Sequence, residues 1–218
     1  MAAKLNVRVI HLITQDFESK AQGGVIHQTA APLASLRGIP NLLVFRPGDA
    51  VEAAEAWECV LRAQANPSVL YLSRQMLPTF RKSISDANLV AFGAYVVLEP
   101  EDGRDITLIA TGSEVTVALE AAKRLERHHI RAAVVSAPCF ELFSGQPETY
   151  RAAVLGNVPR IGIEAGPEGD WTSWIGGCGE FVCISPANAV GVCREPGIDA
   201  RIVATIALKR VTNARATG

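Results

Sequence analysis

Apolar, β-branched runs alternate with amphipathic segments along nearly the whole chain, and this alternation constrains the fold most. Continuous apolar runs are typical of strands buried on both faces of a parallel sheet. Such strands are predicted at 7–14, 41–45, 68–74, 105–111, 131–137, 160–166 and 180–184. Repeated strand–helix–strand crossovers place helices on both faces of such a sheet. The predicted fold is therefore α/β, with two three-layer lobes whose sheets are mainly parallel.

Two of the predicted helices begin with capping residues. Asp49 is followed by Glu52 three residues later, which is a capping-box arrangement. Apolar spacing predicts that this helix buries Ala54, Trp57 and Leu61. Ser113 is the expected N-cap of the second helix. Its predicted buried face comprises Val115, Ala118, Leu119, Ala122 and Leu125.

The chain of 218 residues is long enough for two small domains. Residues 75–105 contain Pro78 and Pro100, charged clusters and no long period, apart from a short strand or hairpin near 94–98. This composition predicts a domain boundary. We expect a first domain at 1–80, a linker at 81–104 and a second domain at 105–218. A pair of tryptophans in the second domain, Trp171 and Trp174, is expected in its core or at a subunit interface.

Composition excludes several classes of protein. The formal net charge is −1 and no basic block is present, so nucleic acid is not the expected partner. No apolar stretch approaches the ~20 residues that span a bilayer, and the first residues lack the pattern of a signal peptide. We expect a soluble, cytoplasmic protein without a membrane partner.

Five cysteines, an odd number without a CxxC pair, predict free thiols in a reducing compartment. Cys178, Cys183 and Cys193 lie close in sequence, but no nearby His completes a tetrahedral ligand set. We therefore predict no metal site.

Ligands of open α/β sheets bind beyond the carboxyl ends of the strands. That rule selects residues 14–24, 46–49, 73–74 and 110–114. Arg74, at the end of a strand, has the geometry to hold a phosphate or carboxylate bidentately, with His27 as a second donor. The alternative is structural: Arg74 pairs with a neighbouring carboxylate, and His27 caps the helix that follows it.

The turn at Gly112 and Ser113 offers backbone N–H groups at a helix start, which suits an anion. The same turn is also an ordinary helix entry, and we favour that interpretation. Asp16, Glu18 and Glu164 lie near strand ends but have no partner that the sequence identifies. We predict no catalytic residue in this chain.

Four segments resemble the C-terminal part of a transketolase, in the order and spacing of that family. They are HQTAAPLASLRGIPNLLVFRPGDAVEAAEAWECVL, VLYLSRQ, LIATGSEVTVALEAAKRL and VVSAPCFELFSGQPETYRAAVL. The FRP-D-AVE-AEAW and ATGSEV motifs are the most specific. The resemblance covers nearly the whole chain. It implies that residues 1 to about 80 are an incomplete thiamine diphosphate pyrimidine-binding domain, and that the rest is the C-terminal domain.

The resemblance also implies a substrate site. His27 falls on the second histidine of a family loop and, together with Arg74 of LSRQ, would hold the substrate phosphate. Gln15 replaces the first histidine of this loop, and Gly23 replaces its substrate-binding aspartate. Two polar contacts to the sugar are therefore expected to be missing.

Transketolases transfer a two-carbon ketol unit between sugar phosphates with thiamine diphosphate and a divalent ion, Mg²⁺ or Ca²⁺. The resemblance places their binding residues, including a catalytic glutamate, before Met1. We therefore expect no cofactor on this chain alone, no activity without a thiamine-binding N-terminal region or subunit, and a homodimeric enzyme. A start at Met1 would favour truncation. Two alternatives stay open: a non-catalytic interaction protein, and an α/β domain that binds a small anion.

A domain cut within its sheet exposes strand edges. We therefore expect the first 80 residues to be loosely held or to associate.

Overall fold

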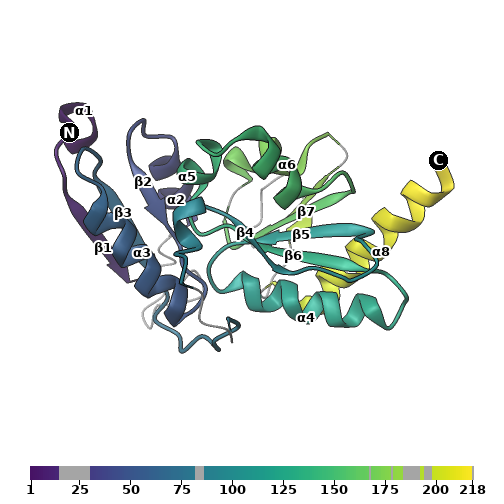
Figure 1. Cartoon of the computed structure of the whole chain (residues 1–218). Coiled ribbons are helices and arrows are strands. Elements are labelled where there is room, and N and C mark those ends of the chain that lie inside the picture. The colour runs from purple at the N-terminus through teal and green to yellow at the C-terminus, as the bar shows by residue number, and fades with distance from the viewer. Residues whose placement is uncertain are drawn as a thin grey trace, which may run out of the picture.

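The computed structural model describes residues 1–14, 30–81, 86–166, 168–177, 179–183, 192–193 and 198–217, which form two α/β lobes side by side (Figure 1). The first lobe has a parallel sheet in the order β1-β3-β2. Its strands are β1 (Ile10–Thr14), β2 (Leu43–Phe45) and β3 (Ser68–Leu72), as predicted. The short helix α1 (Ala2–Leu5) precedes them.

Two helices cover opposite faces of this first sheet, because successive strand residues point to opposite sides. Val44 and Val69 pack with Leu33 of α2 (Ala30–Arg37). Phe45 and Leu70 instead pack with Ala56 and Val60 of α3 (Ala50–Arg62). The central strand β3 is paired on both sides, so only β1 and β2 form edges.

The prediction for the buried face of α3 was wrong. The helix buries Glu52, Ala56 and Val60, whereas Trp57 and Leu61 are 37% and 53% exposed. Ala54 is exposed as well. The helix is rotated because its first turn is held against the second lobe by Glu52, a contact that apolar spacing does not encode.

The second lobe has six strands in the order β4-β6-β5-β7-β8-β9, all parallel except β4, which runs antiparallel to β6. The strands are β4 (Tyr95–Leu98), β5 (Ile106–Ala110), β6 (Ala132–Ser136), β7 (Arg160–Glu164), β8 (Glu180–Cys183) and β9 (Val192–Cys193). The short strand expected near 94–98 is thus an edge strand of this sheet. The second lobe therefore begins about ten residues before position 105, within the segment expected to be a linker.

Helices pack on both faces of the second sheet (Figure 1). One face is covered by α4 (Glu114–Glu126) and the long C-terminal helix α8 (Ala200–Thr217). The other is covered by α5 (Phe140–Ser144), α6 (Glu148–Leu155), η2 (Gly169–Trp171) and α7 (Thr172–Ile175). Trp171 and Trp174 are 1% and 4% exposed, which confirms the prediction of a core position.

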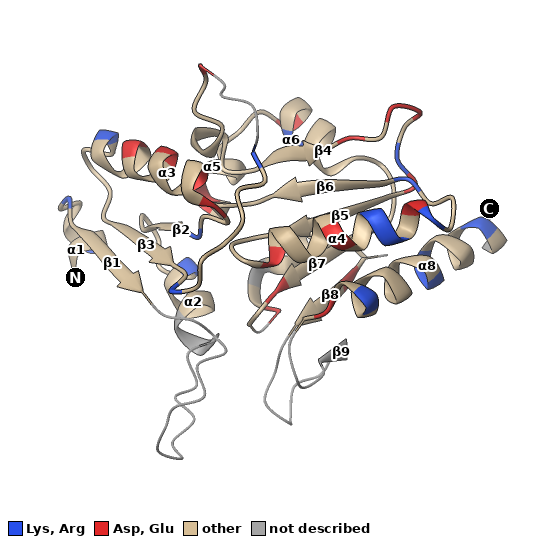
Figure 2. Ribbon diagram, turned by 90° about the horizontal axis from the view of Figure 1, so that it is seen from below, with Lys and Arg blue, Asp and Glu red and all other residues tan. Residues whose placement is uncertain are grey.

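A short helix, η1 (Val90–Phe92), precedes β4 in the connection between the lobes. The two lobes differ in the charge of their outer helices: α3 carries mainly acidic residues, whereas every charged residue of α8 is basic (Figure 2). Among the helices of the described residues, none is both long and apolar enough to cross a membrane.

Candidate functional site

The carboxyl ends of β5, β6 and β7 face the first lobe. The segment that follows β2, which begins with Arg46, contacts the loops that follow β5 and β6. The backbone N–H of Arg46 donates to the Pro138 carbonyl at 2.8 Å, and the Arg46 carbonyl accepts from the Gly112 N–H at 3.1 Å. Several charged side chains are buried where the two lobes meet, and we call this group of side chains the lobe junction. Its members are Arg37, Arg46, Glu52, Glu114 and Glu164.

The Arg46 guanidinium lies at the centre of the lobe junction. Its Nη1 donates to the Thr111 carbonyl at 2.8 Å and lies 2.5 Å from Glu114 Oε2 and 3.6 Å from Glu164 Oε1. Burial alone would lower the pKa of this guanidinium, but the two carboxylates outweigh burial and raise the pKa. Arg46 is thus a fully charged group held inside the protein by opposite charges.

Glu164, for which the sequence identified no partner, is held by the first lobe. Its carboxylate accepts two hydrogen bonds from Arg37, at 2.8 and 2.9 Å, and one from Trp171 Nε1 at 2.7 Å. Burial would raise the pKa of Glu164, but Arg37 and Arg46 lower it. The sequence feature that could have indicated this pair is a glutamate at the end of a strand and an arginine at the end of a helix, but the two residues are separated by 127 positions.

Glu52 has two tasks in the structure. Within α3, Asp49 accepts from the Glu52 N–H at 2.8 Å, which is the first bond of the predicted capping box, whereas the Glu52 side chain reaches back to the N–H of Gly48, one residue before the N-cap, at 2.6 Å. Across the junction it accepts from Tyr95 Oη at 2.7 Å and from Ser136 Oγ at 2.6 Å. The second task was not predicted, because it depends on the docking of the lobes.

The predicted phosphate site is described only in part. Arg74 is exposed just after β3, beside Ser73, whose hydroxyl accepts from the Gln75 N–H at 3.0 Å. His27, Gln15 and Gly23 lie outside the described residues. The pairing of His27 with Arg74 therefore stays a prediction.

The turn at Gly112 and Ser113, an anion-site candidate for which the ordinary helix entry was favoured, lies beside the Arg46 side chain. The Gly112 N–H is bonded to the Arg46 carbonyl, and Ser113 Oγ donates to Glu114 Oε1 at 3.0 Å. Ser113 occupies the N-cap position of α4, as predicted, but makes no side-chain cap bond. The sequence could not indicate which charge this turn would meet.

Cys183 is bonded in a disulfide, so the prediction of free thiols was wrong for this residue. The side chains of Cys178 and Cys193 lie outside the described part of the structure. Cys59 and Cys139 are free. Among the described residues, no group of three or more His, Cys, Asp or Glu side chains is placed to hold a metal ion.

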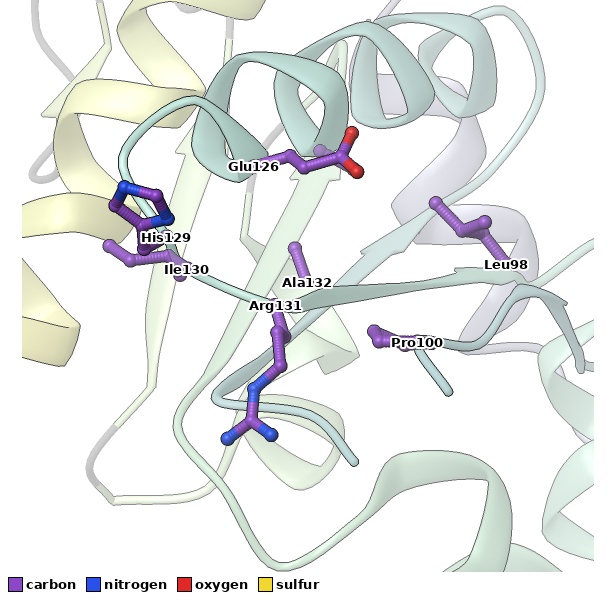
Figure 3. A pocket seen from close by; sticks show the side chains of 8 residues that line it. Leu98, Pro100, Glu126, His129, Ile130, Arg131 and Ala132 are labelled. Atoms are coloured by element: carbon purple, nitrogen blue, oxygen red, sulfur yellow. The ribbon is translucent and has the colours of Figure 1, made fainter. Parts of the chain in front are cut away.

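A pocket of about 370 Å³ lies at the amino end of β6, away from the lobe junction (Figure 3). Its walls are mainly apolar and include Leu98, Pro100 and Ile130. Glu126 and Arg131 point in different directions (Figure 3). Arg131 pairs with Asp105 at 3.1 Å. Binding pockets usually bring a few polar groups to one point, and this pocket does not.

Fold and junction together define a two-domain α/β protein, in which a doubly wound domain is docked on a smaller parallel-sheet domain. Residues 1–79 match the family model of the transketolase pyrimidine binding domain, and residues 93–186 match that of the transketolase-like C-terminal domain. The chain belongs to the transketolase family and corresponds to its C-terminal part.

Individual relatives agree with the family models. The chain is 50% identical to a transketolase of Cereibacter sphaeroides over 84% of its own length and 28% of that protein. It is 44% identical to one of Sinorhizobium medicae over 98% of its length and 32% of that protein. The solved transketolase of Leishmania mexicana superposes with a TM-score of 0.84 at 36% identity, over 97% of this chain and 31% of the other. The chain thus spans about a third of its relatives.

Proposed function

We propose that this chain forms the C-terminal part of a transketolase, an enzyme that transfers a two-carbon ketol unit between sugar phosphates. The observation that carries the proposal is the match to both family domains, in order, with 44% identity to one relative over 98% of the chain. The task proposed for these residues is to bind the phosphate of the substrate and to hold the docked lobes in place.

His27 and Arg74 are the proposed phosphate-binding residues. Arg74 follows β3 at the carboxyl end of a parallel sheet, where ligands of such sheets bind. A guanidinium presents two parallel N–H groups to a phosphate. Gln15 and Gly23 stand where the family has a histidine and an aspartate, so we propose weaker contacts to the sugar than to its phosphate.

Thiamine diphosphate, when bound, supplies the carbanion chemistry of this family. We propose that this chain does not hold the cofactor on its own, which is consistent with the described residues offering no group of three or more His, Cys, Asp or Glu side chains placed for a metal ion. We propose that a thiamine-binding region or subunit, with Mg²⁺ or Ca²⁺, completes the site. The proposed enzyme is a cytoplasmic homodimer.

The test is complementation in a ketol-transfer assay. The purified 218-residue chain, supplied with thiamine diphosphate and Mg²⁺, is expected to show no turnover. Addition of the amino-terminal part of the Cereibacter sphaeroides relative should restore it. In the restored enzyme, Arg74→Ala should raise KM for a sugar phosphate about tenfold or more, since one lost charged contact is worth at least ~1.4 kcal/mol.

Arg62→Ala is the matched control, because the Arg62 side chain is 79% exposed and pairs along its own helix with Glu58. It should leave KM unchanged. Turnover by the chain alone would contradict the need for a second region. An unchanged KM in Arg74→Ala would remove Arg74 from the phosphate site.

A further inference from the structure

The second sheet has a topological switch point between β5 and β7. From β5 the chain crosses by α4 to β6 on one side, and it then returns by α5 and α6 to β7 on the other. Ligands of open α/β sheets bind in the crevice that opens at such a point, beyond the carboxyl ends of the strands. In this protein the crevice is lined by the carbonyl of Thr111 and the carboxylates of Glu114 and Glu164.

These groups select the chemistry of a ligand. All of them are acceptors, and the side chains of Glu114 and Glu164 are only 8% and 2% exposed. An anion would meet two buried negative charges there, whereas a planar cation with several N–H donors satisfies them. The crevice does hold a planar cation: the Arg46 guanidinium contacts all three acceptors.

The floor of the crevice is fitted to a flat group. Gly112 has φ +61, and a Cβ at this position would lie 2.8 Å from Arg46 Nε and 2.9 Å from its Cζ. A side chain would therefore displace the guanidinium. Gly48, two residues after Arg46, approaches equally closely, because its Cβ would lie 2.6 Å from the Gly112 carbonyl oxygen.

We propose that the crevice at the carboxyl ends of β5 and β7 is a guanidinium-binding site, and that Arg46 of the first lobe occupies it as a tethered ligand. In this proposal, the ligand site of the second lobe holds the first lobe in place by binding Arg46. Removal of the Arg46 side chain takes a cation from both Glu114 and Glu164, while Arg37 still pairs with Glu164, and leaves an empty space of the shape of the missing ion. A free guanidinium ion should enter that space.

The experiment is chemical rescue of Arg46→Ala in the full 218-residue chain. Its melting temperature should fall below that of the unaltered chain. Millimolar methylguanidinium chloride should then raise it by roughly 3–6 °C once the ion exceeds its Kd about tenfold. Urea, a neutral planar molecule of similar size, and sodium chloride at equal ionic strength should not raise it.

Two further variants show whether the rescue occurs in this crevice. Arg124→Ala removes a half-buried arginine that pairs with Glu120 on its own helix, and methylguanidinium should have no effect on it. Adding Glu114→Gln to Arg46→Ala removes one of the two carboxylates and should abolish the rescue. If Arg46→Ala does not accumulate in folded form, the yield on refolding with each of the three solutes takes the place of melting.

Rescue by methylguanidinium alone, lost in the double variant, supports the proposal. Equal effects of urea or sodium chloride would overturn it. Absence of rescue in both melting and refolding would overturn it too, as would rescue that persists without Glu114.

Discussion

At the scale of single residues, two buried glutamates show how neighbours decide the state of a carboxyl group. Glu52 and Glu164 are 0% and 2% exposed. Burial dominates at Glu52 and raises its pKa, because its hydrogen-bond donors, Gly48, Tyr95 and Ser136, are neutral. At Glu164 the guanidinium groups of Arg37 and Arg46 overcome burial and lower the pKa.

These opposite shifts predict opposite pH dependences for two glutamine variants. Glu164→Gln removes the negative charge that the buried guanidinium groups of Arg37 and Arg46 share. The unfolding free energy of this variant should be about 3–5 kcal/mol lower than that of the unaltered chain at neutral pH. Since the folded pKa is lowered, this difference from the unaltered chain should shrink as the pH falls below about 4.3, the ordinary value for glutamate. Denaturant titrations across a pH series measure it.

Glu52→Gln is the matched control, because it changes the same atoms at an equally buried site. Gln retains an oxygen for Tyr95 and Ser136, so its loss at neutral pH should be less than half that of Glu164→Gln. The raised folded pKa makes the unaltered chain gain stability over Glu52→Gln as the pH falls toward 4. Parallel pH profiles for the two variants would contradict the assignment of charge at the junction.

At the scale of elements, the side chains in the first turn of α3 both cap the helix and contact residues outside it. Asp49 caps the Glu52 N–H, and its second oxygen accepts from the backbone N–H groups of Phe80 and Arg81, at 3.2 and 3.3 Å. The segment that follows β3 is thereby tied to the start of α3. A single aspartate thus fixes both a helix end and the path of the chain between the two lobes.

Asp49→Ala should therefore cost about 2 kcal/mol of unfolding free energy, at the upper end of values for capping residues. Ser113→Ala serves as the control, since Ser113 holds the same position in α4 without a cap bond. It should change stability by no more than about 0.5 kcal/mol. Equilibrium unfolding in denaturant compares the two variants. Equal losses would show that the Asp49 side chain is not what stabilises this turn.

At the scale of the whole molecule, the two lobes differ in how completely they are built. Among the described residues, the second has six strands with helices on both faces, whereas the first has three strands with β1 at one edge. Leu12 in β1 is 53% exposed. On the other edge, the β2 backbone N–H of Val44 donates to Glu141 of the second lobe at 3.1 Å. The first lobe thus depends on the second for one of its edges.

Limited proteolysis should reflect this difference. The earliest cleavage is expected within residues 1–80, because that lobe has less buried surface to oppose local opening. Arg46→Ala should accelerate this cleavage severalfold, whereas Arg62→Ala, which removes an exposed side chain of α3, should not. Mass spectrometry of the first fragments gives the answer. First cuts within 105–210 would show instead that the first lobe is the more stable one.

Much of the fold followed from local pattern. The positions of all the described strands except β9, the Asp49 cap of α3 and the buried tryptophans were predicted, because alternation and capping are properties of neighbouring residues. The buried face of α3 was not. Apolar spacing favoured Trp57 and Leu61, but Glu52 faces inward because its partners, Tyr95 and Ser136, belong to the other lobe.

Local sequence pattern was sufficient to predict the α/β class and the order of the main strands and helices, and the motifs identified the family to which the chain belongs. The meeting of Arg46, Glu114 and Glu164, and the packing of Arg46 beside the turn at Gly112, depend on how the two lobes dock. The reason is physical: burial of a charge requires an opposite charge at contact distance. Partners such as Arg37 and Glu164, 127 positions apart, come within that distance only when both lobes are folded and docked.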